Sequence, residues 1–175
     1  MSYWYVIWVL TGHERQVEKA IMDRFCNDDI VPFIPLLETL FKRAGKVKKE
    51  LKNMYPGYVF VESHLESGEF LLRTQRFVKE SKDVIRVLRR GDSDEIAIRE
   101  DEKAALLRFC NDDYCIESSM GFIEGDRFYI ESGPLVGMEN VIIEINKKRM
   151  EASFEMEFMG GIRRFTVGLE LLRKI

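Results

Sequence analysis

The chain begins with a hydrophobic pattern that predicts a strand followed by a helix. Tyr3 to Leu10 is a continuous run of mostly aromatic and β-branched residues, which is typical of a central strand. Thr11 and Glu14 then have the spacing of a capping box. The apolar residues that follow recur at helical spacing: Val17, Ala20, Ile21 and Phe25. We therefore predict a helix from about Gly12 to Cys26.

Two prolines and a set of bases mark the next part of the chain. Residues Val31 to Phe41 form an extended segment that is interrupted by Pro32 and Pro35. The segment from Lys42 to Lys52 is rich in lysine and contains the single acid Glu50. This composition predicts a basic hairpin or loop.

The heptad Tyr55 to Val61 predicts a further strand. A proline and a glycine near its start are typical of a strand end or edge. Alternation sends Tyr58 and Phe60 to one face of the strand and the two valines to the other. One face then resembles core and the other a contact surface, although a strand buried on both faces explains the heptad equally well.

A helix, a strand and a second helix follow. Ser67 to Gln75 predicts a short helix with Phe70 and Leu71 facing inward, and Val84 to Leu88 predicts a strand. Arg99 to Cys110 predicts a helix with an acidic first turn. The order of these elements predicts an α+β sandwich of the split-βαβ kind with an antiparallel sheet.

Beyond about Asn111 the chain contains only short runs that resemble strands. These runs are Arg127 to Glu131, Val141 to Ile145, Ala152 to Met159, Arg163 to Val167 and Leu169 to Leu172. Short strands separated by turns predict a small all-β barrel. We expect a first domain over residues 1–112, a linker over 113–119 and the barrel over 120–175.

Composition and charge narrow the class of protein. A chain of 175 residues, 46% hydrophobic and 33% charged, suits a globular domain with a small second module. The formal net charge of -3 excludes a surface coated in positive charge, so any nucleic-acid contact must be local. The longest apolar run is too short for a membrane span or a signal peptide, and we expect a cytoplasmic protein.

Few residues suit catalysis or metal binding. The three cysteines, Cys26, Cys110 and Cys115, form no C-x-x-C motif. The only two histidines, His13 and His64, are far from each other in the sequence. No nucleophile lies beside a plausible base, and no glycine-rich loop suits phosphate binding. We therefore expect no cofactor, no metal and no enzymatic activity.

The segment Ile130 to Ile145 resembles the KOW motif, in which a glycine-rich turn joins two strands of an SH3-like barrel. The match covers Gly133 and Pro134, the loop and the alternating strand after it. Asn140 stands where the motif usually has glycine. Asparagine tolerates positive φ better than most residues, so the backbone bend is compatible with it.

Together with three other segments, this motif resembles the NusG family of transcription elongation factors over nearly the whole chain. The segments are Trp4-Tyr5-Val6-Ile7, Gly12-His13-Glu14 and the strand Pro56-Gly57-Tyr58-Val59-Phe60-Val61. The resemblance implies an NGN-like domain followed by a KOW domain. The segment between Gln75 and Val84 is longer than usual, which favours a specialised LoaP-like antiterminator paralogue.

The resemblance also implies a partner and a function. In the family, a concave face of the first domain rests on the clamp helices of RNA polymerase, and the matching positions are Trp8, Tyr58 and Phe60. Trp4 shares the parity of Trp8, but a core position explains it better. The implied function is transcription elongation and antitermination, in which the protein makes the polymerase more processive and reduces pausing or termination. A nucleic-acid signal in specific operons would recruit the protein.

Family members also contact nucleic acid. The segment that matches the contact with non-template DNA consists of Arg73, Thr74, Gln75 and Arg76. For nascent RNA, the barrel offers two basic clusters: Lys147, Lys148 and Arg149 at a turn, and Arg163 and Arg164 on or near a strand. The barrel is not basic as a whole, so RNA binding would depend on one focused stripe made by both clusters. A solvated hairpin tip explains the first cluster equally well.

The resemblance implies further partners for the barrel, either a ribosomal protein or a termination factor. We expect a monomer that does not bind membranes. A second class of function stays open, namely an RNA-binding or ribosome-associated KOW adaptor that acts without polymerase.

Overall fold

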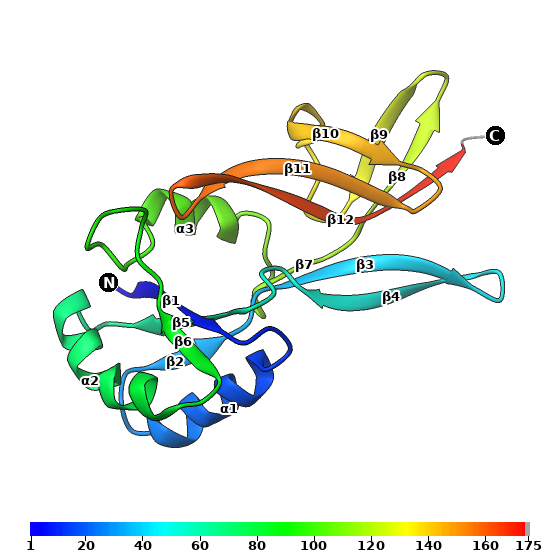
Figure 1. Ribbon diagram of the computed structural model, residues 1–175. Helices are drawn as coiled ribbons and strands as arrows, with labels where there is room; N and C mark the ends of the chain where they lie inside the picture. Colours follow the sequence, from blue (N-terminus) through cyan, green and yellow to red (C-terminus); the bar gives the residue numbers. More distant parts are fainter. Residues whose placement is uncertain (174–175) are drawn as a thin grey trace. The chain divides into compact units, whose positions relative to one another are not determined.

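The computed structural model describes residues 1–173, which divide into two compact units (Figure 1). The first unit consists of Met1–Pro35 and Tyr55–Lys103. The second unit consists of Leu36–Met54 and the chain from Ala104 onward. The second unit therefore includes a segment from the middle of the first half of the chain. Each unit is described separately below.

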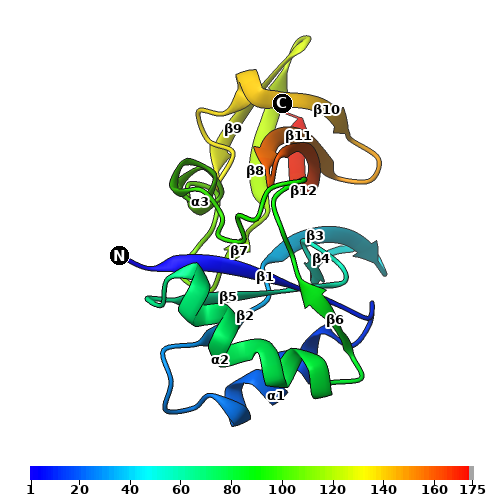
Figure 2. The ribbon, with the colours of Figure 1, turned by 60° about the vertical axis from the view of Figure 1, so that its left-hand side comes forward.

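The first unit is a four-stranded sheet with two helices. Its elements are β1 (Tyr3–Val9), α1 (Glu14–Arg24), β2 (Val31–Phe33), β5 (Tyr58–Ser63), α2 (Ser67–Glu80) and β6 (Val84–Val87). The strand order is β2-β5-β1-β6, and every pair is antiparallel. Both views show α1 and α2 on the same face of this sheet (Figure 1 and Figure 2). This architecture confirms the predicted α+β sandwich.

The helix-covered face of the sheet forms the core of the first unit. Tyr5 on β1 stacks on Phe70 of α2 with ring centroids 3.9 Å apart. Phe70 is fully buried as predicted, whereas Leu71 is 37% exposed, so its predicted inward position is wrong. Consecutive helical residues are turned by about 100°, and the buried stripe of α2 continues from Phe70 to Thr74 instead.

The start of α1 differs from the predicted capping box. The helix begins at Glu14 with His13 at the N-cap, and His13 makes no side-chain capping bond. The carboxylate of Glu14 instead accepts hydrogen bonds from the backbone N–H of Gly12 at 2.9 Å and of Gly57 at 2.6 Å. A buried acid therefore ties the start of α1 to the turn before β5.

A third helix, α3 (Glu100–Leu107), is shorter than the helix predicted over residues 99–110. Its Glu102 forms two hydrogen bonds of 2.7 Å with the guanidinium of Arg90, and both side chains are buried. This pair ties the helix to the turn after β6. Residues 97 and 98 also pair with β1: Ala97 forms an antiparallel bridge with Tyr5, and the backbone N–H of Ile98 donates a hydrogen bond to the C=O of Trp4.

The second unit contains a three-stranded and a five-stranded sheet. Its strands are β3 (Leu36–Arg43), β4 (Lys46–Asn53), β7 (Cys115–Ile116), β8 (Ser119–Glu124), β9 (Arg127–Ser132), β10 (Ile142–Asn146), β11 (Glu151–Phe158) and β12 (Gly161–Arg173), with a short 3₁₀ helix, η1 (Glu139–Val141), before β10. The strand orders are β4-β3-β7 and β10-β11-β12-β8-β9. The basic hairpin predicted over residues 42–52 is confirmed as β3 and β4.

The five-stranded sheet brings its first and last strands together. β8 pairs with β9, and β10, β11 and β12 pair in turn, all antiparallel, whereas β12 pairs in parallel with β8. Among the described residues, β9 and β10 form the two edges of this sheet. Pairing of the first and last strands is typical of a small, partly open barrel. This arrangement agrees with the predicted all-β module. The two strands predicted over residues 163–172 are one continuous strand.

The predicted linker over residues 113–119 includes ordered structure. Cys115 and Ile116 form β7, which pairs in parallel with Leu36 and Leu37 of β3. The division into domains at residues 112 and 120 stays a prediction about how the chain is organised for function.

Candidate functional site

Aromatic side chains gather on the face of the first sheet that is opposite the helices. The register pairs Trp8 with Tyr58 and Val6 with Phe60 across β1 and β5. Phe60 also pairs with Phe33 of β2. Because directly opposed residues of antiparallel strands point to the same face, these aromatic residues share one face. The predicted grouping of Trp8, Tyr58 and Phe60 is confirmed.

The three predicted contact residues differ in exposure. Trp8 is 36% exposed and Tyr58 is half-buried, but Phe60 is only 1% exposed. The ring of Phe60 packs against Trp4, Phe33 and Tyr55, at centroid distances of 6.3, 5.6 and 5.4 Å. The prediction that Phe60 lies on the surface is therefore wrong, because its ring packs against aromatic rings from both neighbouring strands, Trp4 of β1 and Phe33 of β2. The predicted core position of Trp4 is confirmed.

The exposed part of the aromatic face lies at one end of β1 and β5. Arg86 of β6 is paired with Trp8, and its guanidinium carbon lies 5.5 Å from the centre of the Trp8 ring. This geometry is a cation–π contact. Trp8, Tyr58 and Arg86 together form what we call the aromatic end. Arg86 was missed from the sequence because its position beside Trp8 depends on the strand order.

The turn before β5 positions Tyr58. Gly57 has a φ of 88°, its C=O accepts a hydrogen bond from Val9 at 2.8 Å, and its N–H donates to Glu14. Burial raises the pKa of Glu14, but hydrogen bonds from backbone N–H groups, including those of Gly57 and Gly12, outweigh it and lower the pKa overall. The carboxylate is therefore held charged, and it fixes the backbone immediately before Tyr58.

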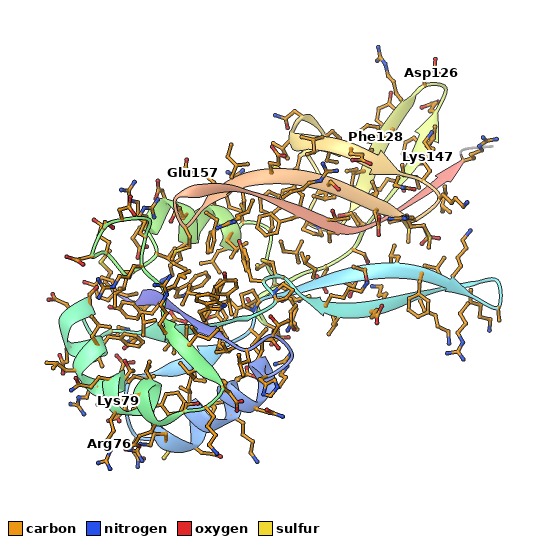
Figure 3. All side chains as sticks on the ribbon, viewed as in Figure 1. Arg76, Lys79, Asp126, Phe128, Lys147 and Glu157 are labelled. Carbon is orange, nitrogen blue, oxygen red and sulfur yellow. The ribbon has the colours of Figure 1, made fainter. Side chains whose placement is uncertain are left out.

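The predicted DNA-binding residues lie together on α2 but do not share a face. Thr74 is 1% exposed and donates its hydroxyl hydrogen to the C=O of Phe70 at 2.8 Å, so its predicted contact with DNA is wrong. Gln75 is exposed. Figure 3 shows Arg76 and Lys79 pointing away from the unit. Because α2 continues to Glu80, Arg76 lies within a helix rather than before a loop.

The two exposed arginines of α2 are paired with acids. Arg73 lies 3.5 Å from Asp28 and 3.8 Å from Glu69. Arg76 donates a hydrogen bond of 2.7 Å to Glu80. Such exposed pairs are weak, and the arginines can exchange them for phosphate contacts at little cost.

The two basic clusters predicted to bind RNA lie at opposite ends of β11. Lys147, Lys148 and Arg149 are exposed in the turn that leads into Glu151, whereas Arg163 pairs with Met156 near the other end of the strand. Figure 3 labels Lys147 and Glu157 at these two ends. Arg163 and Arg164 are also exposed, but Arg164 forms an ion pair with Glu144. The prediction that both clusters form one focused stripe is therefore wrong.

No group of three or more histidine, cysteine, aspartate or glutamate residues within 1–173 is placed to hold a metal ion. Within the same range, no helix has both the length and the apolar character needed to cross a membrane.

Comparison with known proteins identifies the family. The family model described as "Transcription termination factor nusG" matches residues 2–107, which include the three strands of the aromatic end and all of α1 and α2. The chain belongs to the NusG family. This confirms the resemblance noted in the sequence, and it makes the chain a member of a family of transcription termination and antitermination proteins.

The chain is also similar to individual proteins. The chain is 25% identical over 166 residues to "Transcription termination/antitermination protein NusG" of Chlamydia pneumoniae, covering 91% of this chain and 87% of the relative. It is 33% identical over 96 residues to the protein of the same name from Helicobacter pylori strain 26695, covering 47% and 53%. A solved structure described as "Domain interaction in Thermotoga maritima NusG" is 18% identical, covers 96% of this chain and 94% of that chain, and has a TM-score of 0.48.

Proposed function

We propose that this NusG-family chain is a transcription elongation and antitermination factor that binds the clamp helices of RNA polymerase through its aromatic end. Residues 1–112 would form the polymerase-binding domain and residues 120–175 the KOW domain. Family membership supports the role in transcription. The observation that supports the contact is the direct pairing of Trp8 with Tyr58, with the guanidinium of Arg86 over the Trp8 ring.

The chemistry of the aromatic end suits a protein interface. Tryptophan, tyrosine and arginine are the residue types that most often carry binding energy at interfaces. Here one of each lies on neighbouring strands of a rigid sheet, so little side-chain entropy is lost on binding. The buried Phe60 lies beside this site, since it is two residues beyond Tyr58 on β5 and points to the same face of the sheet.

The effect on transcription follows from differential binding. A factor that binds the polymerase more tightly with the clamp closed shifts the equilibrium towards the closed state. Each ~1.4 kcal/mol of preference changes the ratio of closed to open clamp by about tenfold. A closed clamp favours processive elongation and opposes pausing and termination.

Nucleic acid and other proteins complete the proposal. Arg73, Gln75 and Arg76 are the residues of α2 that would meet non-template DNA, and Lys147, Lys148 and Arg149 would meet nascent RNA. A ribosomal protein or a termination factor would bind the barrel. In this proposal the protein is a specialised LoaP-like paralogue. It acts as a monomer in the cytoplasm and is not an enzyme.

Transcription in vitro through an intrinsic terminator tests the proposal. Trp8→Ala combined with Tyr58→Ala should reduce read-through to the level measured without the protein. Tyr129→Ala is the matched control, because Tyr129 is an aromatic residue with 41% exposure on the second unit. Unchanged read-through with the double variant would show that the aromatic end is not the polymerase contact.

The same variants separate this function from that of a free adaptor. A polymerase factor should bind an isolated clamp-helix fragment, and the Trp8 and Tyr58 double variant should lose that binding. A ribosome-associated adaptor should bind no such fragment, whether or not the aromatic end is intact.

A further inference from the structure

The hairpin of β3 and β4 has an outer face that no part of the proposed function uses. The two strands are joined by Ala44 and Gly45, whose φ values of 51° and 74° are those of a type I′ turn. β4 pairs only with β3 and forms the edge of its sheet among the described residues. Figure 1 shows the two strands as a long ribbon that extends beyond β7.

The inner face of this ribbon is fixed by the rest of the second unit. A side chain at Gly168 of β12 would meet the side chain of Leu40 at 2.8 Å, which shows how closely the two strands approach. Glu38 accepts a backbone hydrogen bond from Ser118 at 3.0 Å and pairs with Lys49 at 3.2 Å. Burial raises the pKa of Glu38, but these partners outweigh it and lower the pKa. The ribbon is therefore held from one side.

Near the turn, the outer face consists of an exposed aromatic ring and three cations, while Thr39 and the ion pair of Glu50 with Lys52 lie farther along the same face. The register places Phe41 opposite Lys48 and Arg43 opposite Lys46, so these four side chains share a face. Phe41 is 38% exposed, and the three bases are exposed as well. Within residues 1–173, none of these three bases forms an ion pair.

Folding alone does not account for this face. Like charges directly opposite one another destabilise a pair of strands, and Arg43 faces Lys46 in this way. Lysine on an edge strand discourages unwanted pairing, but that role does not call for an exposed phenylalanine between the cations. A bound polyanion would relieve the repulsion and cover the ring.

The spacing of the face suits a nucleic-acid strand. Successive residues on one face of a strand lie about 6–7 Å apart, so each cation can reach a separate phosphate. An exposed aromatic ring among such cations can stack on a base that is not paired. A lipid surface would need a larger apolar area than one ring, and an acidic peptide would gain little from the ring.

We propose that the outer face of the β3–β4 ribbon binds single-stranded nucleic acid. Arg43, Lys46 and Lys48 contact phosphates, and Phe41 stacks on a base. This inference goes beyond the proposed function, because it requires neither the polymerase nor the aromatic end. It also supplies a single positively charged surface, whereas the two barrel clusters that were predicted to form one stripe lie at opposite ends of β11.

Fluorescence anisotropy with the full chain and a labelled short oligouridine tests the proposal, with oligothymidine and a DNA duplex as further probes. Phe41→Leu keeps an apolar side chain but removes the ring, and it should weaken binding to both single strands about tenfold. Replacing Arg43, Lys46 and Lys48 together by glutamine should reduce the slope of log affinity against log salt by about 2 between about 50 and 200 mM salt.

Lys42→Gln and Lys48→Gln form the matched pair of variants. Each removes one positive charge from the exposed part of the hairpin, but Lys42 pairs with Val47 on the opposite face from Phe41. Lys48→Gln should weaken binding more than Lys42→Gln. Thermal unfolding of every variant checks that the fold is kept.

Three outcomes would overturn the proposal. The first is unchanged affinity and salt slope in the triple variant. The second is an equal effect of Lys42→Gln and Lys48→Gln with no effect of Phe41→Leu, which would indicate a general ionic attraction. The third is tighter binding to the duplex or to polyglutamate than to either single strand. These assays contain no polymerase, so failure of the proposed function would leave their result unchanged.

Discussion

The backbone N–H of Gly57 donates a hydrogen bond of 2.6 Å to the carboxylate of Glu14, which lies 43 residues earlier in the chain. The same carboxylate accepts from Gly12, and Glu14 is only 4% exposed. One buried acid thus joins the first turn of α1 to the start of β5. The aromatic end depends on this link, because Tyr58 follows Gly57 directly.

Glu14→Gln should lower the free energy of unfolding by about 2 kcal/mol at neutral pH, because hydrogen bonds to a charged group are stronger than those to an amide. Urea denaturation measures this. The exposed surface pair of Arg15 and Glu18 provides the control, since Glu18→Gln should cost less than about 0.5 kcal/mol.

The effect of Glu14 should also depend on pH. The pKa of this acid in the folded chain is below its ordinary value of 4.5. Its contribution to stability is therefore complete above that value and is lost as the pH falls through the folded pKa. The difference between the wild-type chain and Glu14→Gln should shrink in this acid range. A difference that stays constant down to acid pH would contradict the assignment.

Glu102→Gln should destabilise the first unit by about 3 kcal/mol, because it replaces the charged carboxylate in two buried hydrogen bonds to the guanidinium of Arg90 by a neutral amide. Arg90→Met combined with Glu102→Leu should cost less than Glu102→Gln alone, since neither charge is then buried. Denaturation of the double variant and of the single variants Arg90→Met and Glu102→Leu measures this coupling. A cost for the double variant that equals the sum of the two single costs would show that the pair does not act as a unit.

Gly121→Ala should destabilise the second unit by about 1–3 kcal/mol. A Cβ at this position would lie 2.0 Å from the carbonyl oxygen of Tyr129, and backbone on a paired strand cannot move away cheaply. Gly161→Ala is the control, because nothing lies within 4 Å of its Cβ position. Thermal unfolding should distinguish the two variants, and equal melting temperatures would count against the close approach of β8 and β9.

Cys110 should resist thiol alkylation at pH 8 in the folded chain, whereas the exposed Cys26 should react. Burial raises the pKa of the Cys110 thiol to about 12, so only about one molecule in ten thousand carries the reactive thiolate at that pH. Mass spectrometry of the alkylated peptides gives the result. Equal labelling of both cysteines in folded protein would refute the burial of Cys110, and labelling in urea provides the reference.

Local patterns in the sequence predicted most of the elements, because periodicity reports which face of an element is buried. The run from Tyr3 to Leu10 became β1, and the basic segment became a hairpin. Alternation also predicted that Trp8, Tyr58 and Phe60 share a face, since side-chain direction on a strand follows from position alone. The strand β8 was missed, because Gly121 interrupts its pattern and its need for glycine comes from Tyr129 of the next strand.

The predictions that were wrong concern burial and distance, which depend on neighbouring strands. The periodicity of a sequence does not show which strands are neighbours. Alternation placed Phe60 on the correct face, but its burial comes from aromatic rings on β1 and β2. The separation of Lys147 from Arg163 follows from the register of β11 and β12, which no local pattern gives. Thr74 is different, because it lies four residues after Phe70 and the predicted inward position of Phe70 already placed it on the buried stripe.

The insertion of residues 36–54 into the second unit has a consequence for synthesis. The hairpin leaves the ribosome long before β12, the strand that covers Leu40, has been translated. Until β12 is made, the inner face of the hairpin is exposed to water. The segments before and after the hairpin belong to the first unit, which can fold first. Nascent chains stalled near residue 112 should therefore be more sensitive to protease within the hairpin than the finished protein, and a released chain that ends there should aggregate.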